Sequence, residues 1–162
     1  MIESLSHAVL ILALAGAVPA RAETYRHTEG GVSIWIPDHW NADLEDDSVS
    51  GFSEDGDAAV ELVSLRGAAD QDAAGRLCQA RLARAVREFE ETEARRETSI
   101  NGLRGFRFAG QGVYRGGTRS LQVIVLKSPR QFLMFLWSAD RATARRWDTI
   151  RDRIAGSIQT IT

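Results

Sequence analysis

Two apolar runs, LQVIVL at Leu121–Leu126 and FLMFLW at Phe132–Trp137, decide how this chain folds. They follow one another closely and are joined around Ser128-Pro129-Arg130, as the two arms of a hairpin would be. A strand with one buried face alternates apolar and polar residues, whereas a strand buried on both faces does not. Because both runs are apolar on both parities, we expect a central pair of strands covered on each side by other elements.

Further strand patterns surround this central pair. Val32–Ile36 alternates and stops at Pro37, which cannot donate a hydrogen bond within a sheet. Asn101-Gly102 is the strongest short hairpin signal in the chain, and Gly116-Gly117 marks another turn. The expected strands are Val32–Ile36, Val49–Ser53, Ala59–Leu65, Arg95–Ile100, Leu103–Tyr114, Ser120–Lys127 and Gln131–Ser138.

Two stretches have helical periodicity. In Asp70–Glu93, with Asp70 or Asp72 as the N-cap, the apolar residues fall within about 120° of arc and form a core-facing stripe. On its polar side we expect two ion pairs at a spacing of four residues, Arg84–Glu88 and Arg87–Glu91. A final helix is expected from Asp140 as its cap to Gly156. Its apolar residues at helical spacing are Ala144, Trp147, Ile150, Ile154 and Ile158.

The order of these elements is β-β-β-α-β-β-β-β-α with hairpin connections. Such an order is typical of an α+β fold, in which an antiparallel sheet of about six or seven strands is sandwiched by helices. No repeat and no linker divides residues 23–162. We therefore expect a single globular domain over that range.

The first 22 residues have the pattern of an export signal. Ala8–Val18 is apolar and uncharged but too short to span a bilayer as a helix. Ala20 and Ala22 fit a signal-peptidase site with cleavage before Glu23. The segment before the apolar run contains Glu3 and lacks the usual Lys or Arg. We expect a periplasmic or secreted protein; a buried N-terminal helix and an uncleaved anchor are the alternatives.

Charge and cysteine content exclude several classes of protein. The chain has 20 basic and 22 acidic residues among 162, a net charge of -2, whereas proteins that bind nucleic acid through phosphates are strongly basic. Its one cysteine, Cys78, excludes an intrachain disulfide framework and a Cys-rich metal site. We therefore expect no nucleic-acid partner and no cofactor.

The candidate catalytic residues do not form a convincing set. Beyond the signal only His27 and His39 remain, and the neighbouring Asp38 is poorly placed to orient His39 as in a triad. His39 is better interpreted as a turn residue and Trp40 as a core residue. Cys78 lies in the apolar helical stripe and is expected in the core; a nucleophile or an intermolecular disulfide is the alternative. No catalytic or metal-binding residue is predicted, and we expect no enzyme.

Two charged segments are candidate contact surfaces. Asp43–Asp57 is acidic, and Asp46, Asp47, Asp55 and Asp57 form the candidate partner surface. Its spacing misses the EF-hand pattern, which leaves a solvated loop or a weak cation site as alternatives. The final helix is rich in arginine and could meet an anionic membrane surface or an acidic partner, or be a solvated face. These arginines are Arg141, Arg145, Arg146, Arg151 and Arg153.

The order of elements and three short motifs resemble the PsbP-like family, which includes Mog-type proteins and bacterial periplasmic relatives of the DcrB kind. The motifs are G-x-S-I-x-I-P-x-x-W at Gly31–Trp40, the hairpin Ser99–Leu103, and Gly156-Ser157-Ile158 at the end of the last helix. The resemblance implies an antiparallel sheet between helices and a mostly non-enzymatic role through protein contacts. No metal-binding or Ran-binding feature of the family carries over to residues of this chain.

We therefore expect a non-enzymatic binding or scaffolding module that acts through contacts with an unidentified protein in the cell envelope. A carrier of a small ligand or lipid is the first alternative, with a groove beside Trp35, Trp40 and Tyr114. A cytoplasmic protein similar to a secretion chaperone is the second, if the signal is not cleaved.

Overall fold

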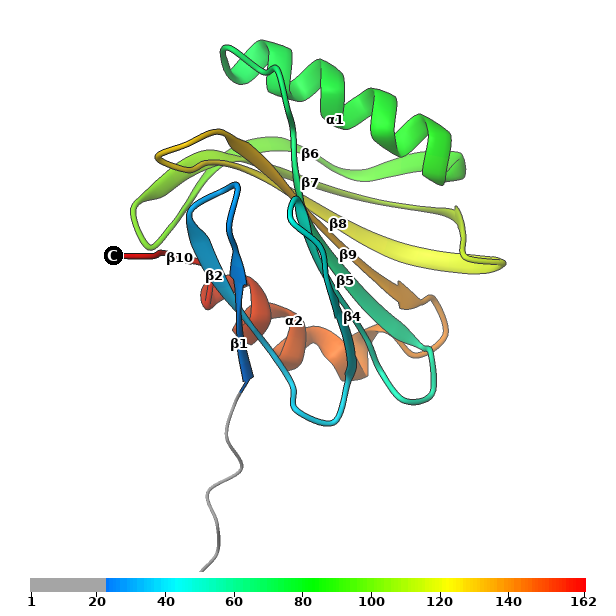
Figure 1. Ribbon diagram of the computed structural model, residues 1–162. Helices are drawn as coiled ribbons and strands as arrows, with labels where there is room; N and C mark the ends of the chain where they lie inside the picture. The colour runs from blue at the N-terminus through cyan, green and yellow to red at the C-terminus, as the bar shows by residue number, and fades with distance from the viewer. Residues whose placement is uncertain (1–22) are drawn as a thin grey trace, which may run out of the picture.

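The computed structural model describes residues 23–162. The expected signal, with Ala20 and Ala22 at its cleavage site, lies outside the described residues. Two antiparallel sheets and two helices make up the described part (Figure 1). None of its helices is both long and apolar enough to cross a membrane.

The larger sheet has seven strands in the spatial order β3-β4-β5-β9-β8-β7-β6, and every neighbouring pair is antiparallel. The two apolar runs occupy β8 and β9, which are interior strands, as expected. The strands are β3 (Asn41–Leu44), β4 (Ser48–Phe52), β5 (Ala58–Ser64), β6 (Arg87–Ile100), β7 (Leu103–Tyr114), β8 (Gly117–Lys127) and β9 (Phe132–Asp140).

A second, three-stranded sheet in the order β1-β2-β10 lies with α2 over one face of the large sheet (Figure 1). Its residues Val32, Ile34 and Ile36 are fully buried in the same core cluster as Ile154 and Ile158. The elements are β1 (Glu23–His27), β2 (Val32–Ile36), β10 (Gln159–Thr160), a 3-10 turn at Ala144–Trp147 and α2 (Asp148–Gly156).

The helix α1 (Gln71–Ala85) covers the opposite face (Figure 1). Asp70 caps it, since its side chain accepts a hydrogen bond of 2.8 Å from the backbone N–H of Ala73. Ala74, Cys78 and Leu82 point into a second core cluster, formed against β7, β8 and β9. The expected sandwich of helices around an antiparallel sheet is therefore confirmed, and each face of the sheet has its own core.

The helix is shorter than expected, because it stops at Ala85 rather than Glu93. Val86 already has extended backbone angles, and the strand β6 begins at Arg87. Val86 and Phe89 still reach the core beneath α1, where a Cβ added at Gly112 or Gly110 would overlap them. The helical pairs expected at Arg84–Glu88 and Arg87–Glu91 are consequently wrong.

Three further details differ from expectation. Asp140 ends β9 and accepts a hydrogen bond of 2.9 Å from Ala142 N–H in a turn, so it does not cap the last helix. The left-handed turn residues before β8 are Arg115 and Gly116, one position earlier than expected. The strands β1, β3 and β10 had no counterpart among the expected elements. The Asn101-Gly102 hairpin is confirmed, with φ of 48° and 82° as a type I′ turn requires.

Candidate functional site

A groove lies between α1 and β5 and is hereafter called the α1 groove. The helix packs mainly on β6, β8 and β9, so the neighbouring interior strand β5 is left less covered. The groove has a volume of about 390 Å³, within the range of small-molecule sites. Its apolar lining consists of Leu65, Leu77, Leu82, Ala85, Met134 and Leu136.

The charged rim of the α1 groove comes from β5, from α1 and from the loop between them, which contains Arg66. On β5, Glu61 shares a face with Val63, which packs in the core beneath α1. On α1, Leu77, Arg81 and Arg84 are spaced by four and three residues and therefore lie on one side of the helix. Three arginines and one glutamate thus surround an apolar floor: Arg66, Arg81, Arg84 and Glu61.

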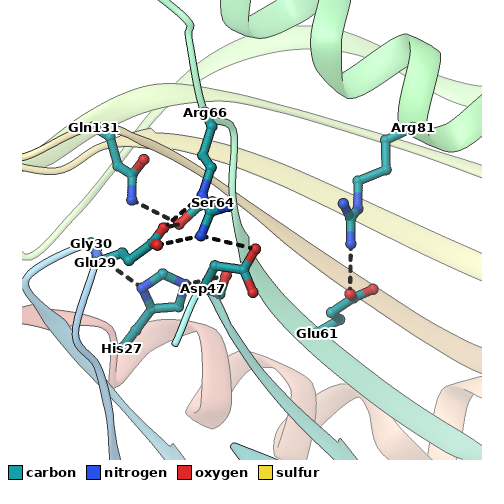
Figure 2. Close-up of polar contacts among 9 residues, drawn as sticks. All are labelled: His27, Glu29, Gly30, Asp47, Glu61, Ser64, Arg66, Arg81 and Gln131. Carbon is teal, nitrogen blue, oxygen red and sulfur yellow. Dashed lines mark hydrogen bonds and ion pairs between the residues drawn. The ribbon is translucent and has the colours of Figure 1, made fainter. Parts of the chain in front are cut away.

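The three arginines differ in the number of carboxylates that their guanidinium groups already contact. Arg81 reaches across from α1 to Glu61, with 2.9 Å between Nη2 and Oε1 (Figure 2). Arg66 is paired with both Glu29 and Asp47. Arg84 is exposed, and no carboxylate of residues 23–162 lies within 4.0 Å of its guanidinium. Arg84 is therefore the cation most available to a ligand.

A polar cluster borders the end of the groove, where the β1–β2 turn meets the end of β5 (Figure 2). Glu29 accepts hydrogen bonds from Arg66 Nε at 3.0 Å and from Ser64 Oγ at 3.1 Å. Gln131 Nε2 donates to Ser64 Oγ at 2.7 Å. The bonds from Arg66 hold the pKa of the Glu29 carboxyl below its ordinary value, so this group is a weak base.

His27 is a fully buried residue whose structural role was not predicted from the sequence. Its Nδ1 accepts from Gly30 N–H at 3.0 Å, so the proton must be on Nε2, which donates to the backbone oxygen of Asp47 at 2.8 Å. The ring thereby ties the β1–β2 sheet to the β3–β4 turn. The only sequence signal is the spacing His27-x-x-Gly30, where a Cβ at Gly30 would lie 2.8 Å from Nδ1.

The structure divides the acidic residues predicted as a partner surface into two groups. Asp46 and Asp47 lie in the turn between β3 and β4, whereas Asp55 and Asp57 lie in the turn at the other end of β4. Asp47 faces Arg66 at 3.5 Å. Asp55 and Asp57 both pair with Arg146, at 3.3 Å in the case of Asp57. The four residues therefore do not form one continuous patch.

The arginine-rich segment is also partly neutralised. Arg146 meets the two aspartates, and Arg151 pairs with Asp148 and Asp152, each at 2.9 Å. Arg153 stacks over Trp35 with its guanidinium carbon 4.2 Å from the ring centroid. Arg141 and Arg145 stay exposed. Most of the basic charge predicted for a membrane surface is therefore engaged within the molecule.

The aromatic residues expected around a ligand groove lie apart. Trp40 is 5% exposed and contacts Trp137 and Trp147, with ring centroids 6.0 and 5.7 Å apart. Tyr114 packs on the other face of the sheet, in the core beneath α1. Trp40 is therefore a core residue, as predicted from the sequence. The three aromatic residues do not line a common groove.

The candidate catalytic residues are not arranged for nucleophilic catalysis. Both nitrogens of His27 are hydrogen-bonded to backbone groups, and His39 lies in an exposed turn 3.5 Å from Asp38. Cys78 is fully buried, and burial raises the pKa of its thiol to about 12. Cys78 is thus a core residue, as expected. Among residues 23–162, no cluster of His, Cys, Asp or Glu is suited to hold a metal ion.

Comparison with solved structures identifies the fold. Cyanobacterial PsbP from Synechocystis sp. PCC 6803 superposes with a TM-score of 0.63 at 14% identity, covering 93% of this chain and 98% of that one. The fold is PsbP-like. No protein-family model matches this chain, and no curated protein matches it by sequence.

Two further structures share the PsbP-like fold. One is a putative regulator of unknown function from Pseudomonas aeruginosa, with a TM-score of 0.54 at 13% identity and coverage of 87% of this chain and 98% of that one. The other is LpqN of Mycobacterium tuberculosis, described as involved in cell envelope biogenesis. It has a TM-score of 0.51 at 12% identity and covers 88% of this chain and 91% of that one. At these identities the likeness concerns the fold alone.

Proposed function

We propose that this chain is a non-enzymatic binding module of the cell envelope and that the α1 groove is its binding site. The observation that carries the proposal is the open groove of about 390 Å³ with an apolar floor and an arginine rim. Leu77 lies at its mouth with 37% of its surface exposed. An apolar floor with few charged groups around it is the usual composition of a ligand site.

The envelope location is supported by two independent lines. The first 22 residues have the apolar run and the Ala20-Arg21-Ala22 pattern of an export signal. The PsbP-like fold also occurs in LpqN, whose description places it in cell envelope biogenesis. Intact mass of the protein from its native host tests the location: a mass beginning at Glu23 is expected, and a full-length mass would contradict export.

The binding site is tested by photo-crosslinking in cells. We place p-benzoylphenylalanine at position 77 in the full chain, and at position 83 as a matched control, since Ala83 is exposed on another side of α1. After irradiation, intact-mass spectra are recorded on chain purified from the envelope fraction. An adduct of any chemistry at position 77 but not at 83 is expected. The absence of an adduct, or equal yields at both positions, would overturn the proposal.

A second contact surface is proposed at the edge strand β3. Leu44 is 52% exposed there, next to Glu45 and Asp46, and β3 has a neighbouring strand on one side only. An exposed apolar residue within an acidic turn fits a protein partner with a basic contact surface. Loss of a protein captured from envelope extract after reversal of Asp46 and Asp47 to lysine would support it. Unchanged capture would exclude this turn as the contact surface.

A further inference from the structure

The backbone of the α1 groove has no free hydrogen-bonding edge. β5 is paired with β4 on one side and β9 on the other, over its full length from Ala58 to Ser64 on the β9 side. The other wall is the helix α1, whose backbone groups bond to one another. An extended peptide therefore cannot add itself as a strand here.

The floor of the α1 groove is apolar and offers a ligand no free backbone hydrogen-bonding group. The groove has a volume of about 390 Å³, and its floor is formed by leucine, alanine and methionine side chains. One acyl chain needs no hydrogen-bond partners, so it can lie on such a floor without leaving a polar group unsatisfied.

The charged residues around the apolar floor indicate the chemistry of the ligand's polar head group. Arg81 and Arg84 are three residues apart on α1 and are therefore neighbours on the helix surface. Arg84 has no carboxylate within 4.0 Å among the described residues, and Arg81 has only Glu61. The guanidinium group pairs bidentately with a carboxylate. A ligand with an anionic head and an apolar chain complements both parts of the groove.

We infer that the α1 groove binds a fatty acid, with the acyl chain on the apolar floor and the carboxylate at Arg84 and Arg81. This inference rests on the proposed function and names the ligand class of the same groove. The Glu61 carboxylate occupies Arg81 in the empty groove, so it competes with the ligand for that guanidinium. Glu61 therefore limits the affinity, while Arg84 contributes to it.

Calorimetric titration of the purified full chain with laurate tests the ligand class. Dodecyltrimethylammonium and dodecyl maltoside serve as cationic and neutral probes with the same chain length. We expect laurate to bind more tightly than either, and about fifteenfold more tightly than decanoate, since each buried CH₂ contributes about fourfold. Equal binding of the three heads, no binding of laurate, or binding of a lysophosphatidate alone would overturn the fatty-acid assignment.

Four variants separate binding from folding. Arg84→Gln should weaken laurate binding about threefold and Glu61→Gln should tighten it about threefold, as for exposed charge pairs. Leu77→Glu should weaken it at least about tenfold. Arg76→Gln, on another side of α1, is the control and should leave it unchanged. Because Glu61→Gln is expected to gain affinity, loss of fold cannot imitate it; weaker laurate binding in that variant would contradict the competition.

The crosslinking experiment distinguishes failure of this inference from failure of the proposed function. An acyl adduct at position 77 supports both. A cross-linked protein at position 77 would overturn the fatty acid as occupant and leave the groove as a binding site. No adduct at that position would remove the binding site itself.

Discussion

The two faces of the large sheet carry grooves of different chemistry. On the face toward α2, the three-stranded sheet and the helix cover a core in which the rings of Trp40 and Trp137 stack. The groove on this face, between α2 and β6–β8, has a volume of about 450 Å³ and is lined by polar residues such as Gln111 and Gln122. On the face toward α1 (Figure 1), the helix leaves β5 less covered, and Leu77 stays 37% exposed at an apolar groove. The α1 face therefore leaves apolar surface available for a ligand, whereas the groove on the α2 face is polar.

The largest predicted effect is the difference in the free energy of unfolding between two truncations, one of an apolar residue on each face of the sheet. Trp137 is 3% exposed, and Trp137→Ala should lower the free energy of unfolding by about 3–5 kcal/mol, because it leaves a cavity. Leu77→Ala should change it by no more than about 0.5 kcal/mol, as at surface positions. Urea unfolding measures both. Similar losses for the two variants would mean that Leu77 is packed as tightly as Trp137 and that the α1 groove is closed.

A second prediction concerns the close approach of β7 and β8 in the centre of the sheet. A Cβ at Gly105 would lie 1.7 Å from the carbonyl oxygen of Val125, so Gly105→Ala must push the two strands apart. We expect a loss of about 1–3 kcal/mol in the free energy of unfolding. Gly117→Ala is the matched control, because no atom lies within 4 Å of a Cβ there. An unaffected Gly105→Ala variant would contradict the described strand pairing.

The core beneath α1 can be probed through its thiol. Burial raises the pKa of Cys78 from 9.0 to about 12, so iodoacetamide should label it in urea but not in the folded chain at pH 8.5. The unfolded thiol ionises above pH 9.0 while the folded one stays protonated. Stability should therefore fall as pH rises from 9.0 toward about 12, and Cys78→Ala should remove this part of the pH dependence. Rapid labelling of the folded chain would show that α1 is not closed over this core.

The smallest effect is expected at the polar cluster beside the groove. Hydrogen bonds from Arg66 lower the folded pKa of Glu29 below the ordinary 4.5. A lowered folded pKa contributes stability above pH 4.5 that is lost as the pH falls through the folded value. Arg66→Gln should flatten this acid-side decline in unfolding measurements, whereas Arg76→Gln should preserve it. An unchanged decline in Arg66→Gln would exclude this ion pair as its source.

The sequence predicts which residues of this fold are buried better than it predicts where the helices and strands end. The strand Leu103–Tyr114 and the burial of Cys78 agree with expectation because hydrophobic periodicity directly reports burial. The end of α1 does not. Val86 and Phe89 fit a helical stripe, but in the structure Val86 faces the core from the cap of α1 and Phe89 from the edge strand β6. Periodicity alone cannot separate these two structures over so few residues.

The candidate site was not predictable from sequence for a different reason. The α1 groove exists because a helix covers some strands and leaves β5 less covered, which is a property of packing between distant segments. Arg81 and Glu61 are 20 residues apart, and the network of Glu29 and Arg66 spans 37. No local motif encodes such a gap, and the aromatic residues that suggested a groove instead lie in separate cores.

Nuclear magnetic resonance titration with laurate tests the central claim most directly. The methyl groups of Met134 and Leu136 report on the α1 groove, and the indole N–H of Trp137 reports on the face toward α2. We predict saturable shifts of these methyl resonances with an unchanged indole resonance. Shifts centred on Trp137, or no shift of any of these methyl groups at saturating laurate, would contradict the claim that the α1 groove is the binding site.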